Sequence, residues 1–239
     1  MENGIIISIS RISRSLNTGI ASDKQIILTD LHLLTYRQND LFSKIHFQID
    51  DDKGSNMNYQ EEGFNKLTSR RAYYLSSLIE HYDKIIYSDI DTIWKKDPRP
   101  YFKGGQFDFW AQIDGVIEGS PYFKGFIPFI CTGFLALRST PITLKLLQKW
   151  QNVTAANPIL HQDQNVIQRI AFELDANYAV LPMELFPSGR LYFETMSNQD
   201  REKIVVLHNN FIVGKEKKIT RFKNFHLWAL DFKDGKQRN

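Results

Sequence analysis

The feature that most constrains the fold is an apolar helix pattern that leads directly into a short apolar strand ending in two aspartates. In residues 64–79, apolar side chains recur at helical spacing on one broad face. An apolar run at 84–88 follows, with Asp89 and Asp91 at its end. Residues i and i+2 of a strand share a face, so we expect both carboxylates to point to the same side, with Ile90 turned toward the core.

Apolar runs elsewhere predict several more buried elements. We expect strands at 4–9, 25–30, 44–49, 107–113, 129–137 and 204–207, and helices at 31–41, at 162–174 and from Pro141 onward, the last with Leu144, Leu147 and Trp150 on its apolar face. Residues 50–59 read as a loop and 233–239 as a polar tail. This order of elements predicts an α/β sheet covered on both faces, with ligands bound at the carboxyl ends of the strands.

Asp89 and Asp91 lie at such a strand end, where two carboxylates suit a divalent cation. Mg²⁺ and Mn²⁺ prefer carboxylate and water ligands and often share them with substrate phosphates. A pair of acids one residue apart also occurs in ordinary solvated turns, so the pair needs support from the rest of the chain.

Composition excludes several classes of function. The 239 residues carry a formal net charge of +3, too small for a dedicated nucleic-acid-binding stripe. The single cysteine, Cys131, rules out an internal disulfide and a cysteine-based zinc cluster, and we expect it to be a small buried residue. No stretch reaches membrane-spanning length, and the first residues do not resemble a signal peptide. We therefore expect a soluble chain, unless an N-terminal anchor has been removed.

Six ordered segments carry a family resemblance. From Phe64 to Trp228 the chain resembles nucleotide-sugar transferases of the GT-A fold, closest to the rhamnogalacturonan xylosyltransferase-like family. The matching segments are HYDKIIYSDIDTIW (81–94), AQIDG (111–115), CTGFLALRS (131–139), DQ (163–164), FPSGR (186–190) and LHNNFIVG (207–214).

The resemblance implies one GT-A domain over residues 1–239, a Rossmann-like three-layer α/β fold with a mainly parallel mixed central sheet. It implies a glycosyltransferase that moves a xylose- or galactose-like sugar from a UDP-sugar donor to a hydroxyl of a glycan or protein-linked acceptor. Mn²⁺ or Mg²⁺ would be the cofactor. Anomeric configuration would be retained, by an enzyme nucleophile or by same-face attack. The Golgi lumen would be the location if an anchor is missing, and the cytoplasm otherwise; the oligomeric state stays open.

The resemblance assigns the metal and the diphosphate to particular residues. Asp91 would be a direct metal ligand, Asp89 would contact the metal, the ribose or both, and His208 would be the third ligand. Considered alone, His208 reads as a surface histidine. Lys217 or Lys218 would lie over the diphosphate as a positive charge, against the alternative of a solvated charge run.

Other residues are assigned to the donor. Asp30 matches a family carboxylate at the end of the second strand, and Gly214 matches a donor-binding position. Arg70 matches the basic residue that precedes the metal motif, while its neighbour Arg71 competes for that role.

Asp114, Asp163 and Gln164 are the candidates for catalysis at the sugar. A carboxylate there can bind sugar hydroxyls and offset the positive charge of an oxocarbenium-like transition state. For Asp163 the alternative is a cap on the helix that follows. Gly133 fits a position where the backbone lies close to the substrate or packs tightly.

The N-terminal part departs from the family pattern. Only about 14 residues separate the first two predicted strands, so the nucleotide-binding part is predicted to be shortened. This departure favours a second hypothesis, a non-catalytic relative that binds nucleotide or glycan. A third is a Mg²⁺-dependent phosphohydrolase, because Asp89-Ile90-Asp91-Thr92 resembles the nucleophile motif of haloacid-dehalogenase-like phosphatases.

Overall fold

The computed structural model describes residues 4–10, 44–49, 62–89, 91–103, 106–118, 126–157 and 163–228. The elements predicted at 25–30 and 31–41, the loop at 50–59 and the polar tail at 233–239 lie outside these residues, as do Asp30 and Ile90. The prediction of a shortened nucleotide-binding part rests mostly on residues 11–43, which also lie outside them.

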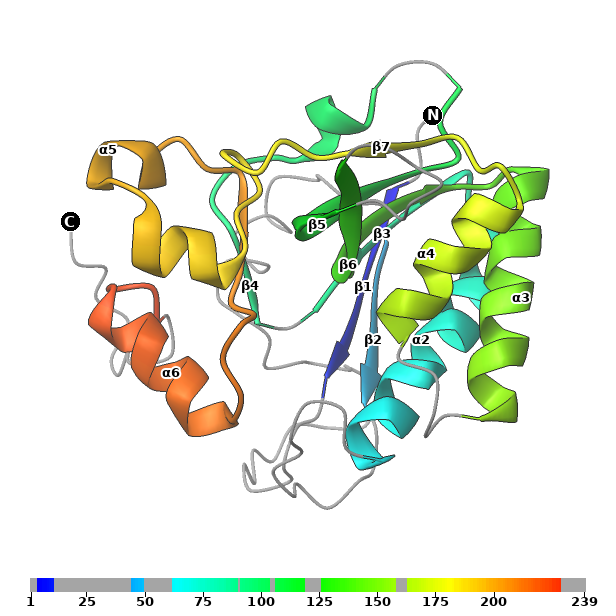
Figure 1. Cartoon of the computed structure of the whole chain (residues 1–239), viewed down its shortest axis with the longest axis horizontal. Helices are drawn as coiled ribbons and strands as arrows, with labels where there is room; N and C mark the ends of the chain where they lie inside the picture. The colour runs from blue at the N-terminus through cyan, green and yellow to red at the C-terminus, as the bar shows by residue number, and fades with distance from the viewer. Residues whose placement is uncertain are drawn as a thin grey trace.

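A six-stranded mixed sheet forms the centre of the described structure (Figure 1). Its strands are β1 (Gly4–Ser10), β2 (Lys44–Ile49), β3 (Lys84–Ser88), β5 (Phe109–Glu118), β6 (Phe126–Arg138) and β7 (Tyr178–Val180), in the spatial order β2-β1-β3-β6-β5-β7. β1 pairs in parallel with β2 and β3, and β5 with β7, whereas β6 runs antiparallel to β3 and β5. The predicted mainly parallel mixed sheet is confirmed.

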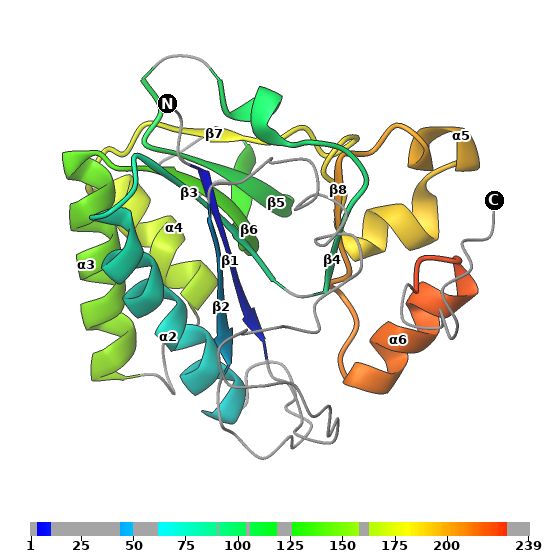
Figure 2. The ribbon, with the colours of Figure 1, turned by 180° about the vertical axis from the view of Figure 1, so that it is seen from behind.

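Three helices cover one face of this sheet (Figures 1 and 2): α2 (Glu62–Ile79), α3 (Pro141–Ala156) and α4 (Asp163–Glu173). Successive side chains of a strand point to opposite faces. Ile85 and Tyr87 therefore pack in the core beneath the helices, while Ile86 packs in the core on the other face. α3 begins as predicted, with Pro141 in its first turn and the Thr140 side chain accepting a hydrogen bond from the Thr143 N–H.

The opposite face carries a second layer built mainly from the C-terminal part of the chain (Figure 2). A two-stranded sheet of β4 (Thr92–Trp94) and β8 (Val206–His208) lies there, with the short 3₁₀ segment Arg99–Phe102, the π-helical turn Leu191–Thr195, α5 (Asn198–Arg201) and α6 (Lys215–Asn224). Trp94, Trp110 and Phe134 are buried there, and the Trp94 and Phe134 rings meet edge to face at 5.5 Å. The predicted layers on both faces are confirmed.

Several local predictions need correction. The run 84–94 is not one strand, because β3 ends before Asp89 and β4 begins only at Thr92. The two aspartates therefore lie in the turn between these strands and do not share a strand face. On α3, Leu144 is exposed, and Leu146 takes the buried position beside Leu147.

α6 was not predicted as a helix because its sequence is mostly charged. Of its residues only Phe222 is buried, so it lacks the broad apolar stripe that identifies α2. β7 was also missed, since a strand of three residues offers too little alternation to recognise. No helix in the described part of the chain has the length and apolar character needed to cross a membrane.

Candidate functional site

The turn between β3 and β4 presents Asp89 and Asp91. The Asp89 N–H donates to the carbonyl of Gly133 on β6 at 2.8 Å, which holds the end of β3 to its neighbour. The Asp89 carbonyl then accepts hydrogen bonds from the N–H of Thr92 at 3.2 Å and from its hydroxyl at 2.8 Å, closing the turn. The Asp91 carbonyl accepts from the Asn209 N–H at 2.9 Å. Both acids are thus fixed through their backbones.

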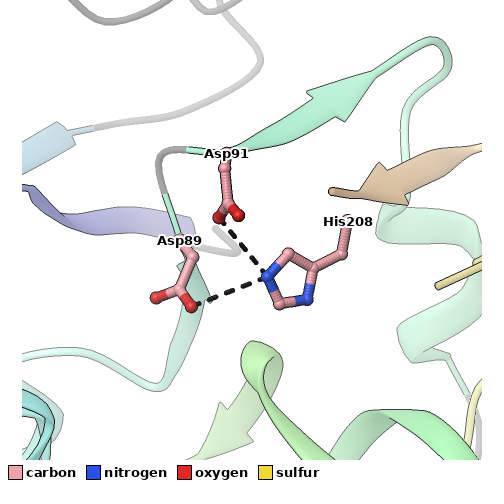
Figure 3. A group of neighbouring side chains, drawn as sticks. All are labelled: Asp89, Asp91 and His208. Atoms are coloured by element: carbon pink, nitrogen blue, oxygen red, sulfur yellow. Dashed lines mark ion pairs between the residues drawn. The ribbon is translucent and has the colours of Figure 1, made fainter. Parts of the chain in front are cut away.

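His208 reaches the two aspartates through strand pairing. β4 and β8 run antiparallel with Thr92 opposite His208, so the histidine arrives beside Asp91. Its Nε2 lies 3.3 Å from Asp91 Oδ1 and 3.7 Å from Asp89 Oδ2 (Figure 3). His208 is buried, so the hypothesis that it is a surface histidine is wrong.

The three side chains have the composition and spacing of a divalent-ion site. One ligand atom from each of Asp89, Asp91 and His208 lies within 4.8 Å of the other two. Neighbouring ligands of an octahedral ion with bonds of about 2.1 Å lie roughly 3 Å apart, and His208 Nε2 lies 3.3 and 3.7 Å from the carboxylate oxygens of Asp91 and Asp89. Two carboxylate oxygens with one imidazole nitrogen suit Mn²⁺, and the carboxylates also suit Mg²⁺.

Gly133 leaves the room that this group needs. A Cβ atom at this position would lie 2.8 Å from Asp89 Oδ2 and would overlap the His208 ring. The expectation that the backbone packs tightly at Gly133 is confirmed, and what it packs against is the group of candidate metal ligands.

Lys218 places a positive charge against Asp91. α6 begins after Gly214, whose φ of 98° favours glycine, and Lys218 lies in its first turns with Nζ 2.5 Å from Asp91 Oδ2. Burial would raise the pKa of Asp91, but Lys218 and His208 hold it well below its usual range. Burial likewise opposes protonation of His208, yet the carboxylate of Asp91 raises the pKa of His208 above its ordinary value. Lys217 is exposed on the same helix.

Arg71, and not its neighbour Arg70, enters the site. Arg71 is 5% exposed and donates to Asp89 Oδ1 at 3.0 Å and to Thr132 Oγ1 at 2.7 Å, and it also contacts the carboxylate of Asp163. Burial would lower the pKa of Arg71, but the surrounding carboxylates raise it. Arg70 is exposed. Neighbouring helix residues point about 100° apart, so only one of the two can face the sheet end.

Asp163 is the first residue of α4, and its side chain is buried. Its carboxylate accepts from Thr132 Oγ1 at 3.1 Å as well as from Arg71. Burial raises the pKa of Asp163, with Arg71 acting in the opposite direction. Arg71 thus joins Asp89 and Asp163 into one polar network, to which the Tyr87 hydroxyl adds a hydrogen bond donated to Asp89.

Asp114 and Gln164 meet on another side of the site. The β5–β6 register shifts between Ile113 and Gly115, so Asp114 stands at an irregularity of the strand, a common way to redirect a side chain. Gln164 Nε2 donates to Asp114 Oδ2 at 2.8 Å, and Asn210 Nδ2 donates to Asp114 Oδ1 at 2.5 Å. Asn210 is held in turn by the Gly189 N–H, which donates to its side-chain oxygen at 2.7 Å.

These groups line one cavity of about 320 Å³. Its lining residues are Thr68, Arg71, Asp89, Asp91, Asp114, Cys131, Thr132, Gly133, Asp163, Gln164, His208, Asn210, Phe211, Ile212, Val213, Gly214 and Lys218. The structure therefore brings together the predicted site residues except Arg70, which is not among them, and Asp30, which lies outside the described residues.

Sequence reasoning gave no role to Tyr87, Thr132 or Asn210, and it ranked Arg71 behind Arg70. Asn210 and Thr132 stand inside segments that carry the family resemblance, so their positions were the available clue. The apolar wall Phe211–Ile212–Val213 was also missed as part of the site; Phe211 is 49% exposed and has a φ of 56°.

The chain is similar in sequence to several known proteins. The sequence profile of a family described as nucleotide-diphospho-sugar transferase matches residues 33–222. UDP-D-xylose:L-fucose alpha-1,3-D-xylosyltransferase 3 of Arabidopsis thaliana is 30% identical over 96% of this chain and 63% of its own length. UDP-galactose:fucoside alpha-3-galactosyltransferase of Dictyostelium discoideum is 24% identical over 72% of this chain and 29% of its own length. The chain thus spans less than two thirds of either relative.

Among solved structures, a glycosyltransferase involved in the glycosylation of the major capsid of PBCV-1 superposes with a TM-score of 0.57. The match covers 94% of this chain and 99% of that chain at 14% identity. At this level of identity the likeness concerns the fold, and it confirms the predicted GT-A architecture.

Proposed function

Because the chain belongs to the nucleotide-diphospho-sugar transferase family, we propose that it is a metal-dependent glycosyltransferase. It moves xylose or a galactose-like sugar from a UDP-sugar to a hydroxyl acceptor, with retention of the anomeric configuration. The observation that carries the proposal is the grouping of Asp89, Asp91 and His208 in the same cavity as Asp114 and Gln164. The same cavity is thus lined by candidate metal ligands and by hydrogen-bonding groups suited to a sugar.

The metal half of the cavity is the diphosphate end in this proposal. Asp89, Asp91 and His208 would hold Mn²⁺ or Mg²⁺, which acts as a Lewis acid toward a phosphate leaving group. Lys218 then turns its ammonium from Asp91 toward the diphosphate, where a compact positive charge offsets the negative charge that develops there.

The other half would hold the sugar. Asp114 is kept in place by amide donors from Gln164 and Asn210, and a second carboxylate, Asp163, is held by Arg71 and Thr132. Fixed carboxylates can bind sugar hydroxyls and stabilise an oxocarbenium-like transition state without reorganising. Either an enzyme nucleophile or same-face attack by the acceptor hydroxyl would give retention.

The names of the relatives support the choice of donor, acceptor and stereochemistry. They are a UDP-xylose and a UDP-galactose transferase, each named for a fucose or fucoside acceptor and for an alpha linkage. Since the sugars of both donors are α-linked to UDP, an alpha product corresponds to retention. A fucoside is therefore the first acceptor to test.

The experiment measures UDP release from UDP-xylose and UDP-galactose, with methyl L-fucoside as acceptor and with Mn²⁺, Mg²⁺ or EDTA. We expect release with a metal, loss with EDTA, and a product with an α-anomeric proton in its NMR spectrum. Asp91→Asn should abolish activity, whereas Asp83→Asn, an exposed aspartate before β3, should not.

The same assay separates the other hypotheses. Metal-dependent UDP binding without release or transfer from any donor would favour the non-catalytic relative, the alternative suggested by the departure of the N-terminal sequence from the family pattern. Metal-dependent hydrolysis of p-nitrophenyl phosphate without sugar transfer would favour the phosphohydrolase.

A further inference from the structure

The single cysteine of the sequence lies against the far side of the candidate metal ligand His208. Cys131 is on β6, 1% exposed, and lines the cavity. Its Sγ is 3.3 Å from Nδ1 of His208, while Nε2 of the same ring faces Asp89 and Asp91. One nitrogen of His208 thus points to the ion site and the other to the thiol.

A histidine that binds a metal through Nε2 carries its hydrogen on Nδ1. Such histidines nearly always donate this second N–H to an acceptor, which fixes the tautomer and the ring orientation. The usual acceptor is a carboxylate, a backbone carbonyl or water. At His208 a thiol sulfur occupies that place, within hydrogen-bonding distance for sulfur.

The thiol also contacts the sugar half of the cavity. Asn210 Nδ2 lies 3.8 Å from Cys131 Sγ and donates to Asp114 Oδ1. Cys131 is buried where it contacts both groups, and its sulfur is a weak hydrogen-bond acceptor.

We propose that Cys131 is a positioning residue of the metal site: its sulfur accepts the Nδ1–H of His208 and holds the ring so that Nε2 faces Asp89 and Asp91. Through Asn210 the same sulfur links the metal half of the cavity to Asp114. The inference rests on the proposed function, because it takes His208 to be a metal ligand.

An alternative role is simple packing. The His208 ring is confined by the backbone at Gly133, and a cysteine side chain fills space beside it. Packing depends on volume, whereas positioning depends on an acceptor atom. Cys131→Ser keeps an acceptor in a smaller side chain, and Cys131→Ala removes it, so the two variants separate these roles.

The test is Mn²⁺ affinity of the full chain in the presence of saturating UDP, measured by the electron paramagnetic resonance signal of free Mn²⁺. We expect Cys131→Ala to weaken Mn²⁺ binding by about 10- to 100-fold, the usual range for loss of such a partner. Cys131→Ser should stay within about threefold of wild type. Transfer activity of Cys131→Ala should be recovered by raising Mn²⁺, which a misfolded site would not allow.

Leu146→Val, which leaves a small cavity beneath α3, is the control for packing loss distant from the site, and should lower thermal stability without changing Mn²⁺ affinity. Wild-type affinity in Cys131→Ala overturns this inference alone. So does a Cys131→Ser protein as weak as Cys131→Ala, because that result indicates packing. A wild-type protein that binds UDP but no Mn²⁺ overturns the metal dependence of the proposed function, and this inference with it.

Discussion

Lys218 Nζ lies 2.5 Å from Asp91 Oδ2, joining the first turns of α6 to the turn between β3 and β4. The two residues are 127 positions apart in the sequence. A lysine that neutralises a candidate metal ligand competes with the metal for that carboxylate. Once a diphosphate is present, the same ammonium has a better partner. Removing the lysine charge should therefore favour Mn²⁺ binding when nucleotide is absent and weaken nucleotide binding when UDP is present.

We expect Lys218→Gln to bind Mn²⁺ more tightly than wild type when nucleotide is absent, because one positive charge beside the ion is removed. With UDP present, the variant should bind the nucleotide about tenfold more weakly, since a charge-assisted contact is lost. Calorimetry with and without UDP measures both effects. Lys217→Gln, exposed on the same helix, is the matched control. Weaker Mn²⁺ binding in both conditions would contradict competition for Asp91.

Metal binding should depend on pH through His208. Burial opposes protonation, but Asp91 and then Asp89 raise the pKa of His208, so the metal-free protein keeps a proton there to higher pH than a free histidine does, and Mn²⁺ must displace it. Mn²⁺ affinity should therefore fall as the pH is lowered through this pKa, approaching tenfold per pH unit below it.

The stability of the metal-free fold should change with pH in the opposite direction to the Mn²⁺ affinity. A raised pKa stabilises the metal-free fold below the unfolded value of about 6.5, and this stabilisation is lost as the pH rises through the folded pKa.

The exchange of Mn²⁺ for the His208 proton can be measured directly. Calorimetric titrations of Mn²⁺ in two buffers of different ionisation enthalpy count the protons that binding releases. Mn²⁺ binding with no proton release near neutral pH would show that His208 is not protonated there.

Arg71 is expected to be needed for stability as well as for the site. It is buried between Asp89 and Asp163, and Arg71→Met would leave both carboxylates without their cation. Removing one partner of a buried ion pair costs about 3–5 kcal/mol. Urea unfolding measures the loss. Arg70→Met, exposed on the same helix, should cost well under 1 kcal/mol. Equal losses in the two variants would contradict the placement of Arg71.

Gly133→Ala is expected to disrupt the metal site more than the fold. The added methyl group would crowd the His208 ring and Asp89 Oδ2, the latter at 2.8 Å. We expect Mn²⁺ affinity to fall by at least tenfold, a loss of about 1.4 kcal/mol in binding. Thermal unfolding of the same variant monitors the fold. Unchanged Mn²⁺ affinity would mean that the ring and the carboxylate can shift without affecting the ion.

The apolar wall Phe211–Ile212–Val213 is expected to contact the acceptor. Phe211 and Val213 are 49% and 42% exposed where they line the cavity, and Phe211 has a left-handed φ of 56°, a conformation that costs energy in a residue other than glycine. Aromatic rings present an apolar face to sugar C–H groups, so Phe211→Ala should raise the KM for methyl L-fucoside about tenfold with UDP affinity unchanged.

Comparison of methyl L-fucoside with methyl L-galactoside, which differ in the hydroxyl at C6, tests whether the wall favours an apolar C6. Phe172→Ala, 81% exposed on α4, is the control. A large loss of UDP affinity in Phe211→Ala would assign the wall to the nucleotide.

The sequence alone predicted those helices and strands that have a clear local pattern of apolar residues. The helical spacing of apolar residues identified α2, and the dense apolar runs identified β1, β2, β3 and the core of β6. Ordered family segments added His208, Asp114 and Gln164, which no periodicity would have selected. The prediction of family membership is confirmed by the profile match over residues 33–222.

Other features were decided only by long-range contacts. Arg70 and Arg71 are adjacent and chemically identical, and the packing of α2 on the sheet determines which one faces the cavity. α6 is mostly charged and is held by long-range contacts, Phe222 in an apolar cluster and Lys218 against Asp91, which its local sequence pattern does not reveal.

By itself, the sequence determined most of the longer sheet-forming segments, the family and the two aspartates at a strand end, because these depend on neighbours along the chain. The tertiary structure decided that Asp89, Asp91 and His208 form one group, that Arg71 joins it, and that Cys131 lies behind the histidine. The physical reason is the register of β4 against β8: opposing strands place Thr92 across from His208, and a shift by one residue would turn the imidazole to the other face.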